Sequence, residues 1–190
     1  MYVFRNIVLI KYYFITHFYI VYTLEILGGF KMFNFLKKEK NIFAPVIGKV
    51  LDLSEVPDEV FARKLAGDGI AIDCENDTIV APADGVISLI FKTNHAIGIT
   101  LKDGVELLIH IGIDTVNLNG EGFERLLQEG DKVKVGDPII KINRDFIRSQ
   151  GYSLITPVLI TDPNGVKNIK YKTGFNVESE NDIVITYTNK

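Results

Sequence analysis

The chain contains very little cysteine and histidine, which restricts the chemistry that it can perform. Its 190 residues include one cysteine, Cys74, and three histidines, and the formal net charge is -3. A single cysteine excludes an internal disulfide and a cysteine-based zinc site, and it fits the reducing conditions of the cytoplasm. Because basic residues are not in excess, we expect no nucleic-acid partner.

Long helical patterns are also lacking, since no amphipathic stretch after residue 41 reaches four helical turns. Short alternating runs separated by Gly and Asp turns predict an all-β fold, an antiparallel β-sandwich or barrel with a few single-turn helices. The expected strands cover residues 48–51, 70–73, 78–81, 85–91, 96–101, 105–111, 132–135, 138–142, 153–159 and 182–187. Single helical turns are expected within residues 57–64, 122–129 and 145–150.

Residues 1–31 differ in composition from the rest of the chain, with nine of the twenty aromatic residues but only four charged ones. A membrane anchor would place His17 and Glu25 in the bilayer at high cost. In a secretory signal, Lys11 would interrupt the apolar core, and no cleavage site follows. We favour a third interpretation, an upstream extension that is absent from the native protein or disordered. Codons for residues 27–32 can contain GGAGG shortly before ATG, so translation would start at Met32.

A short amphipathic segment, residues 32–41, precedes the domain that we place at residues 42–190. Four apolar residues between positions 32 and 36 fall on one side of a helical turn or two, and three lysines follow by position 40. Such a segment can touch anionic lipid weakly. It can equally be an ordinary chain end with solubilising lysines, which the pattern alone slightly favours.

His95 and His110, the two histidines of the domain, flank an expected hairpin. Asp103-Gly104 lies between two alternating apolar runs, the strongest short-range signal for a two-residue turn. With that turn, His95 lies opposite Gly112 and diagonal to His110 on the same face, roughly 7–8 Å away at the backbone. A three-residue turn would place the histidines on opposite faces, so the prediction depends on the register.

Two neighbouring imidazoles near pH 7 suit only a few tasks, because a neutral ring nitrogen is a nucleophile or a metal ligand. A structural zinc site needs four ligands, and only Asp114, in an HxxxD pattern, offers a third. Asp114 can equally orient the backbone. The surroundings favour phosphoryl transfer, because an apolar neighbourhood slows the hydrolysis of a phosphohistidine. Thr93 offers a hydroxyl to a phosphoryl oxygen, and Gly112 allows the backbone to come close.

Two motifs contain these histidines: TNHA at residues 93–96 and VELLIHIGIDTV at residues 105–116. With them, the sequence resembles the glucose-type IIA component of the bacterial phosphoenolpyruvate-dependent sugar phosphotransferase system. The resemblance extends over residues 42–190. Further matching stretches are residues 57–62, 67–72, 80–85, 120–123 and 156–158.

The resemblance implies a phosphocarrier that supports sugar uptake on a β-sandwich fold. His110 corresponds to the histidine that is phosphorylated on Nε2, and His95 to the second histidine, which steadies the phosphoryl group and aids its onward transfer. The donor would be the phosphocarrier HPr, and the acceptor a cysteine of a sugar-specific IIB domain. Val60, Phe61 and Phe91 correspond to the apolar rim where partners dock.

The resemblance also bears on cofactors and location. No cofactor is required, but in some relatives the two histidines hold Zn²⁺ together with a carboxylate from a regulated partner protein. The membrane-touching N-terminus of the family supports the same role for residues 32–40 and a start at Met32. We therefore expect a cytoplasmic protein that contacts the inner face of the membrane.

Two alternatives come from other functional classes. A zinc peptidase of the LytM type shares an HxxxD element and a related β architecture, but it also needs a His-x-His pair, which the domain lacks. A purely regulatory binding module that has lost transfer would be expected to lack His95 or His110, and both are present.

Overall fold

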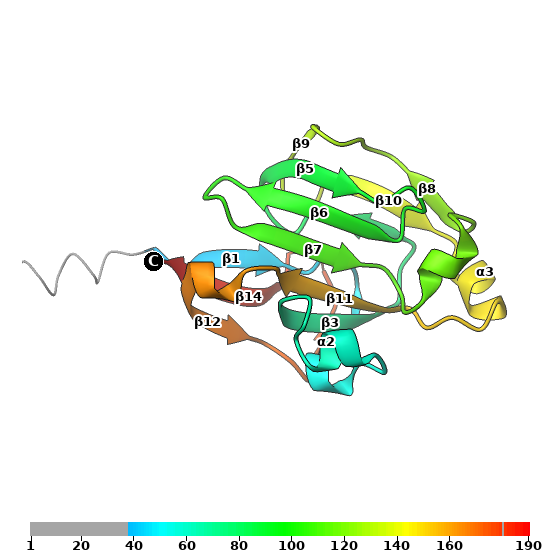
Figure 1. Ribbon diagram of the computed structural model, residues 1–190, viewed down its shortest axis with the longest axis horizontal. Helices are drawn as coiled ribbons and strands as arrows, with labels where there is room; N and C mark the ends of the chain where they lie inside the picture. Colours follow the sequence, from blue (N-terminus) through cyan, green and yellow to red (C-terminus); the bar gives the residue numbers. More distant parts are fainter. Residues whose placement is uncertain (1–37, 180) are drawn as a thin grey trace, which may run out of the picture. The chain divides into compact units, whose positions relative to one another are not determined.

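Strands form where apolar and polar side chains alternate between glycine and aspartate turns (Figure 1). The computed structural model describes residues 38–179 and 181–190. The extension at residues 1–31 and most of the segment 32–41 lie outside this part. The strands are β1 (Lys40–Phe43), β2 (Gly48–Asp52), β3 (Asp68–Cys74), β4 (Thr78–Val80), β5 (Gly85–Ile90), β6 (Ala96–Leu101), β7 (Glu106–His110), β8 (Phe123–Arg125), β9 (Lys132–Val133), β10 (Pro138–Ile142), β11 (Ile155–Ile160), β12 (Val166–Tyr171), β13 (Asn176–Val177) and β14 (Ile183–Asn189).

The strands form three antiparallel sheets, and the helices between them are short. The largest sheet has the order β13-β2-β3-β11-β7-β6-β5-β9, and the two smaller sheets have the orders β4-β10-β8 and β1-β14-β12. The helices are α2 (Glu59–Ala62) and α3 (Arg144–Ser149), with 3-10 turns η1 (Leu53–Glu55), η2 (Thr115–Leu118) and η3 (Pro163–Gly165). The predicted fold class, an antiparallel β-sandwich, is confirmed.

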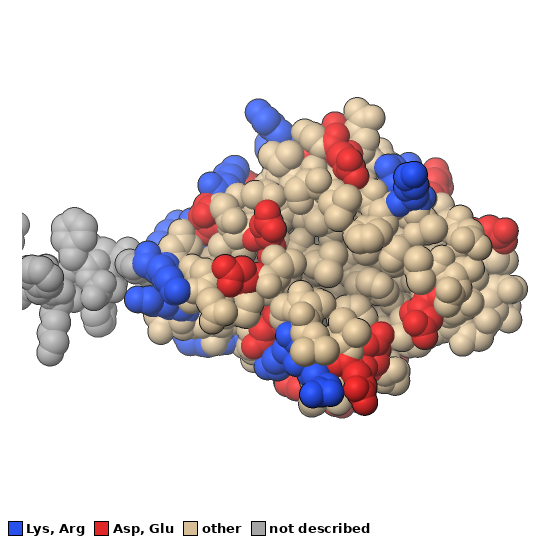
Figure 2. Space-filling model, viewed as in Figure 1, with Lys and Arg blue, Asp and Glu red and all other residues tan. Residues whose placement is uncertain are grey.

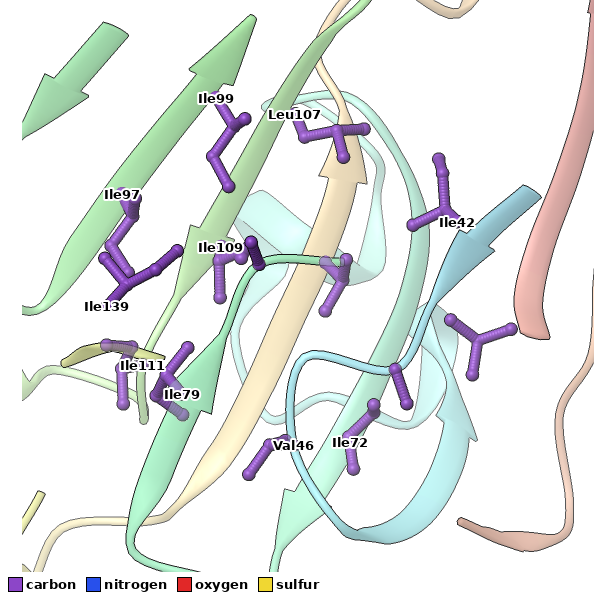
Figure 3. Packing of buried hydrophobic residues seen from close by; sticks show 14 of the residues in the cluster. Ile42, Val46, Ile72, Ile79, Ile97, Ile99, Leu107, Ile109, Ile111 and Ile139 are labelled. Carbon is purple, nitrogen blue, oxygen red and sulfur yellow. The ribbon is translucent and has the colours of Figure 1, made fainter. Parts of the chain in front are cut away.

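Isoleucine and valine side chains fill the space between the sheets. Ile97 of β6 and Ile109 of β7 are fully buried and extend toward the small β4-β10-β8 sheet. Figure 3 shows Ile97 beside Ile139 of β10, and Ile111 beside Ile79 of β4. Burying a side chain of this size contributes roughly 1.5–3 kcal/mol, so this layer fixes the positions of β6 and β7 firmly.

A second apolar cluster covers the opposite face of the large sheet. Its buried members are Leu53, Val56, Phe61, Ala71, Ile113 and Leu159. The segment from η1 to α2 therefore packs over β3 and β11 and brings Phe61 to the end of β7 (Figure 1). Asp58 caps α2 by accepting a hydrogen bond from the Val60 amide at 2.7 Å. This cap fixes where the helix begins.

The prediction of a helical turn at residues 122–129 was wrong. Phe123–Arg125 forms β8, which pairs with β10 and leaves Phe123 packed against the main core. The short strands β1, β12 and β13 also escaped prediction. Apolar alternation is weak in β12, because lysine and asparagine occupy most of its exposed positions. The strand lies at the edge of its sheet, where such residues prevent unwanted pairing.

The predicted register of the β6–β7 hairpin was also wrong by one residue. The predicted register placed Gly112 opposite His95 and therefore Ile97 opposite His110, whereas in the ladder Ala96 lies opposite His110. The loop has three residues, because the Leu101 amide donates to the Val105 carbonyl and the Gly104 amide donates to the Leu101 carbonyl. Gly104 has φ of 84° and Asp103 does not have a positive φ, as expected when Gly104 is the last position of a three-residue loop, whereas a type I′ two-residue turn needs positive φ at both residues.

Among residues 38–179 and 181–190, no helix has the length and apolar character needed to cross a lipid bilayer.

We predict that Gly104→Ala lowers the free energy of unfolding by about 1 kcal/mol, because a Cβ strains the left-handed conformation. A Cβ at this position would meet no atom within 4 Å, so steric contact does not contribute. Gly104→Asn should lose clearly less, because asparagine tolerates this conformation. Urea unfolding measures both variants. Equal stability of the alanine variant and the parent would contradict the left-handed conformation of Gly104.

Candidate active site

The imidazole rings of His95 and His110 lie against each other at one end of the β6–β7 pair. Their ring centroids are 5.1 Å apart and the rings are inclined by 75°. The prediction that the two rings meet is therefore confirmed, although the register that led to it was wrong. His95 precedes the first residue of β6, so the alternation of the strand does not determine where its side chain points.

The ring of His110 is held by a hydrogen bond to its own turn. Its Nδ1 lies 2.8 Å from the carbonyl oxygen of Gly112. Because a carbonyl only accepts, Nδ1 must carry the proton, and the lone pair of the neutral ring is on Nε2. The turn also requires glycine: φ of Gly112 is 73°, and a Cβ there would lie 2.6 Å from the Ser153 carbonyl oxygen.

Thr93 contacts the ring of His95 from the loop before β6. The hydroxyl oxygen of Thr93 lies 2.5 Å from Nδ1 of His95. When the hydroxyl donates, the neutral ring carries its proton on Nε2 and can donate it to a bound anion. The Thr93 hydroxyl thus contacts the ring of His95, the histidine that the resemblance assigns to onward transfer. Direct donation from Thr93 to a phosphoryl oxygen stays a prediction.

Asp114 follows His110 at the exposed start of η2. It adopts the left-handed conformation, with φ of 59°, and its carbonyl accepts a hydrogen bond from the Asn117 amide at 3.1 Å. Its side chain makes no capping hydrogen bond to η2. The negative charge of Asp114 favours the protonated form of His110. Both the backbone role and an electrostatic role of Asp114 therefore have a structural basis.

An aromatic side chain contacts each of the two rings. Phe91 contacts His95, with ring centroids 5.2 Å apart, and is 43% exposed, while Val60 is 46% exposed. Figure 2 shows that the area where β6 begins and β7 ends carries no Lys, Arg, Asp or Glu, with charged side chains around it. A docking role for Val60 and Phe91 stays a prediction.

Phe61 departs from the expectation that it forms part of the docking rim. It is only 5% exposed, and its ring centroid lies 5.0 Å from that of His110. Its place in the second apolar cluster explains this burial, since the side chain fills the space between α2 and the sheet. Phe61 therefore packs against the ring of His110 and offers almost no surface to a partner.

Arg125 is a site residue that the sequence did not reveal. From β8, its guanidinium donates hydrogen bonds to the loop that carries Thr93 and leads into His95. The two segments are separated by about thirty positions in the chain and belong to different sheets. A charged residue at the end of a short amphipathic stretch gives no sign of such a contact.

Burial keeps both rings neutral near pH 7. Burial, followed by repulsion from His110, lowers the pKa of His95 to about 4. Burial also lowers the pKa of His110, while the bond to Gly112 and the charges of Asp58 and Asp114 act in the opposite direction. A neutral His110 has a nucleophilic Nε2, so the arrangement suits acceptance of an electrophilic group.

Two imidazoles make only part of a zinc site. Each ring can offer Nε2, since each Nδ1 already has a hydrogen-bond partner, a pattern that suits metal ligands. Zinc in proteins usually takes three or four protein ligands. Within the described part of the chain, no three His, Cys, Asp or Glu side chains come together as such a group. The pair therefore fits Zn²⁺ only if another molecule supplies further ligands.

We predict that the stability of the protein falls as the pH drops from 6.5 toward 4, because unfolding restores the ordinary pKa of His95 and lets it bind a proton. Above pH 6.5 this contribution is complete. In His95→Gln, the unfolding free energy should differ less between pH 6.5 and pH 5 than it does in the parent. Urea unfolding at both pH values measures it. An unchanged slope, or titration of His95 near 6.5 in NMR spectra, would contradict the buried neutral ring.

Comparison with known proteins places this site in a family. Residues 40–166 match the family described as phosphoenolpyruvate-dependent sugar phosphotransferase system, EIIA 1. The PTS system glucose-specific EIIA component of Borreliella burgdorferi is 43% identical over 155 residues, which are 80% of this chain and 82% of that protein. The PTS system glucose-specific EIICBA component of Staphylococcus carnosus is 50% identical over 124 residues, which are 65% of this chain but only 18% of that protein.

A solved structure agrees. Glucose permease IIA from Mycoplasma capricolum superimposes with a TM-score of 0.73 at 35% identity, covering 78% of this chain and 96% of that one. This similarity confirms the predicted resemblance and extends it to the arrangement of the strands. The zinc-peptidase and regulatory-module alternatives are not favoured. The chain belongs to the EIIA 1 family of the phosphoenolpyruvate-dependent sugar phosphotransferase system.

Proposed function

We propose that this chain is a phosphocarrier in sugar uptake. His110 accepts a phosphoryl group from phosphorylated HPr on Nε2 and passes it to a cysteine of a sugar-specific IIB domain. The observation that carries this proposal is the hydrogen bond from Nδ1 of His110 to the Gly112 carbonyl, which leaves Nε2 as the nucleophile beside His95. Membership of the family supports the same role.

Each transfer exchanges one bond to phosphorus for another. The lone pair of His110 Nε2 attacks phosphorus, and the bond between phosphorus and the donor breaks, with its electrons returning to the donor atom that held the group. In the second step the cysteine thiolate attacks phosphorus, and the electrons of the P–Nε2 bond return to His110. The protein mainly needs to position the group and stabilise its charge.

His95 supplies part of that stabilisation. With the Thr93 hydroxyl donating to Nδ1, the Nε2–H of His95 is directed toward the side where its ring meets His110. A hydrogen bond to a phosphoryl oxygen in this half-buried apolar setting is stronger than it would be in water. We assign His95 to onward transfer, because the group leaving His110 must be steadied while its bond breaks.

The surface around the rings offers a docking area for both partners. Val60 and Phe91 present exposed apolar area, and Asp58 and Asp114 add negative charge beside His110. A partner with a matching apolar centre and a positive margin would dock here while excluding water from the rings. The glucose-specific names of two relatives make a glucose permease the first acceptor to test.

Further partners and location follow from the resemblance. We infer that a regulated protein could complete a zinc site on His95 and His110 by supplying a carboxylate, while phosphoryl transfer itself needs no metal. We also infer that the chain works in the cytoplasm, where HPr and IIB domains would meet it, with weak membrane contact through residues 32–40.

We predict that incubation with phosphoenolpyruvate, Enzyme I and HPr phosphorylates the protein on His110. His110→Gln should lose the label completely, because no other side chain of the site offers a neutral nucleophilic nitrogen in the same position. Radioactive phosphate or mass spectrometry measures the label. Labelling of His110→Gln to the extent of the parent would refute the assignment.

We predict that His95→Gln still accepts phosphate on His110 but donates it slowly. Loss of a positioned donor should slow transfer to the IIB domain by on the order of 10²-fold or more. Quenched-flow measurement of transfer from purified phosphoprotein separates the two steps. Unchanged donation, or loss of acceptance alone, would show that His95 acts differently.

A further inference from the structure

The loop of residues 91–94 determines where the His95 ring lies. The pleat of β6 would direct His95 to the core face, together with Ile97, yet its ring meets His110 on the other face. The chain turns just before it: Asn94 has φ of 58°, and its amide donates to the Phe91 carbonyl at 2.8 Å. The conformation of this loop therefore controls the contact between the histidines.

The guanidinium of Arg125 fastens this loop from a neighbouring sheet. Its Nε donates to Oδ1 of Asn94 at 2.8 Å. One terminal nitrogen donates to the carbonyl of Phe91 at 2.9 Å and lies 3.5 Å from that of Ile90. The acceptors belong to the loop or to Ile90, the last residue of β5. Arg125 therefore forms hydrogen bonds to both ends of the turn.

We propose that Arg125 is a positioning residue that holds the 91–94 loop so that the rings of His95 and His110 meet. The inference rests on the proposed function for its catalytic consequence, but its structural content is independent of that function. The guanidinium is planar and carries its donors in a fixed fork, which matches two acceptors at once. Charge-assisted bonds of this kind are roughly twice as strong as neutral ones.

The position of Arg125 allows its role to be separated from folding. The side chain is exposed, and it lies on the three-residue strand β8 rather than in the core. Asn94→Gly removes the same hydrogen bond from the acceptor side, because glycine keeps the left-handed conformation but lacks the Oδ1 acceptor. Lys141, an exposed basic residue on the adjacent strand β10, is a matched control for the loss of positive charge.

The test compares Arg125→Gln, Asn94→Gly and Lys141→Gln with the parent by two readouts. NMR measures nuclear Overhauser contacts between the rings of His95 and His110. Quenched flow measures transfer from phosphorylated protein to the IIB domain. We expect Arg125→Gln to weaken the ring contacts and to slow transfer by about tenfold or more, since a displacement of 1 Å can cost 10²-fold. Asn94→Gly should lose less, and Lys141→Gln should match the parent.

A double variant separates positioning from a general structural effect. Because Arg125 acts through His95, Arg125→Gln should slow transfer no further when His95 is already glutamine. Parental ring contacts in Arg125→Gln, or a full additional loss in the double variant, would overturn the inference. If the parent itself carries no label on His110, the proposed function fails, while the ring contacts still decide the role of Arg125.

Discussion

The hydrogen bond from Nδ1 of His110 to the carbonyl of Gly112 is the constraint on which the site depends. A ring that is half-buried among apolar side chains needs a partner for its polar atoms, and this bond supplies one from within the same turn. It also selects the tautomer and so places the lone pair on Nε2. The left-handed conformation of Gly112, beside the Ser153 carbonyl, makes the bond geometrically accessible.

The sandwich holds this bond in place from both sides. On the core face, Ile109 and Ile111 anchor the end of β7 between the sheets. On the opposite face, Phe61 reaches the His110 ring from α2. The strand that carries His110 is therefore packed on two faces, whereas the position of His95 depends on a loop. This difference fits the proposed roles, in which the firmly held His110 carries the phosphoryl group and His95 aids its onward transfer.

Much of the fold could be predicted because alternating runs and Gly-Asp turns mark most strands. The register of the histidine hairpin could not, since Asp103-Gly104 suits both a two-residue and a three-residue loop. The two rings lie together nonetheless, because the turn at Asn94 directs the His95 side chain toward His110. Arg125 escaped prediction altogether, as its contact with Asn94 joins different sheets. Sequence patterns report local periodicity, and contacts between sheets leave little trace in it.

We propose that His110 carries the phosphoryl group on Nε2 while Nδ1 keeps its proton and its bond to Gly112. Nitrogen-15 NMR of the phosphorylated protein, with labelled histidine, identifies the phosphorylated nitrogen directly. We expect a phosphorus coupling to Nε2 of His110 and a proton on Nδ1. Phosphorylation at Nδ1, or on His95, would contradict it.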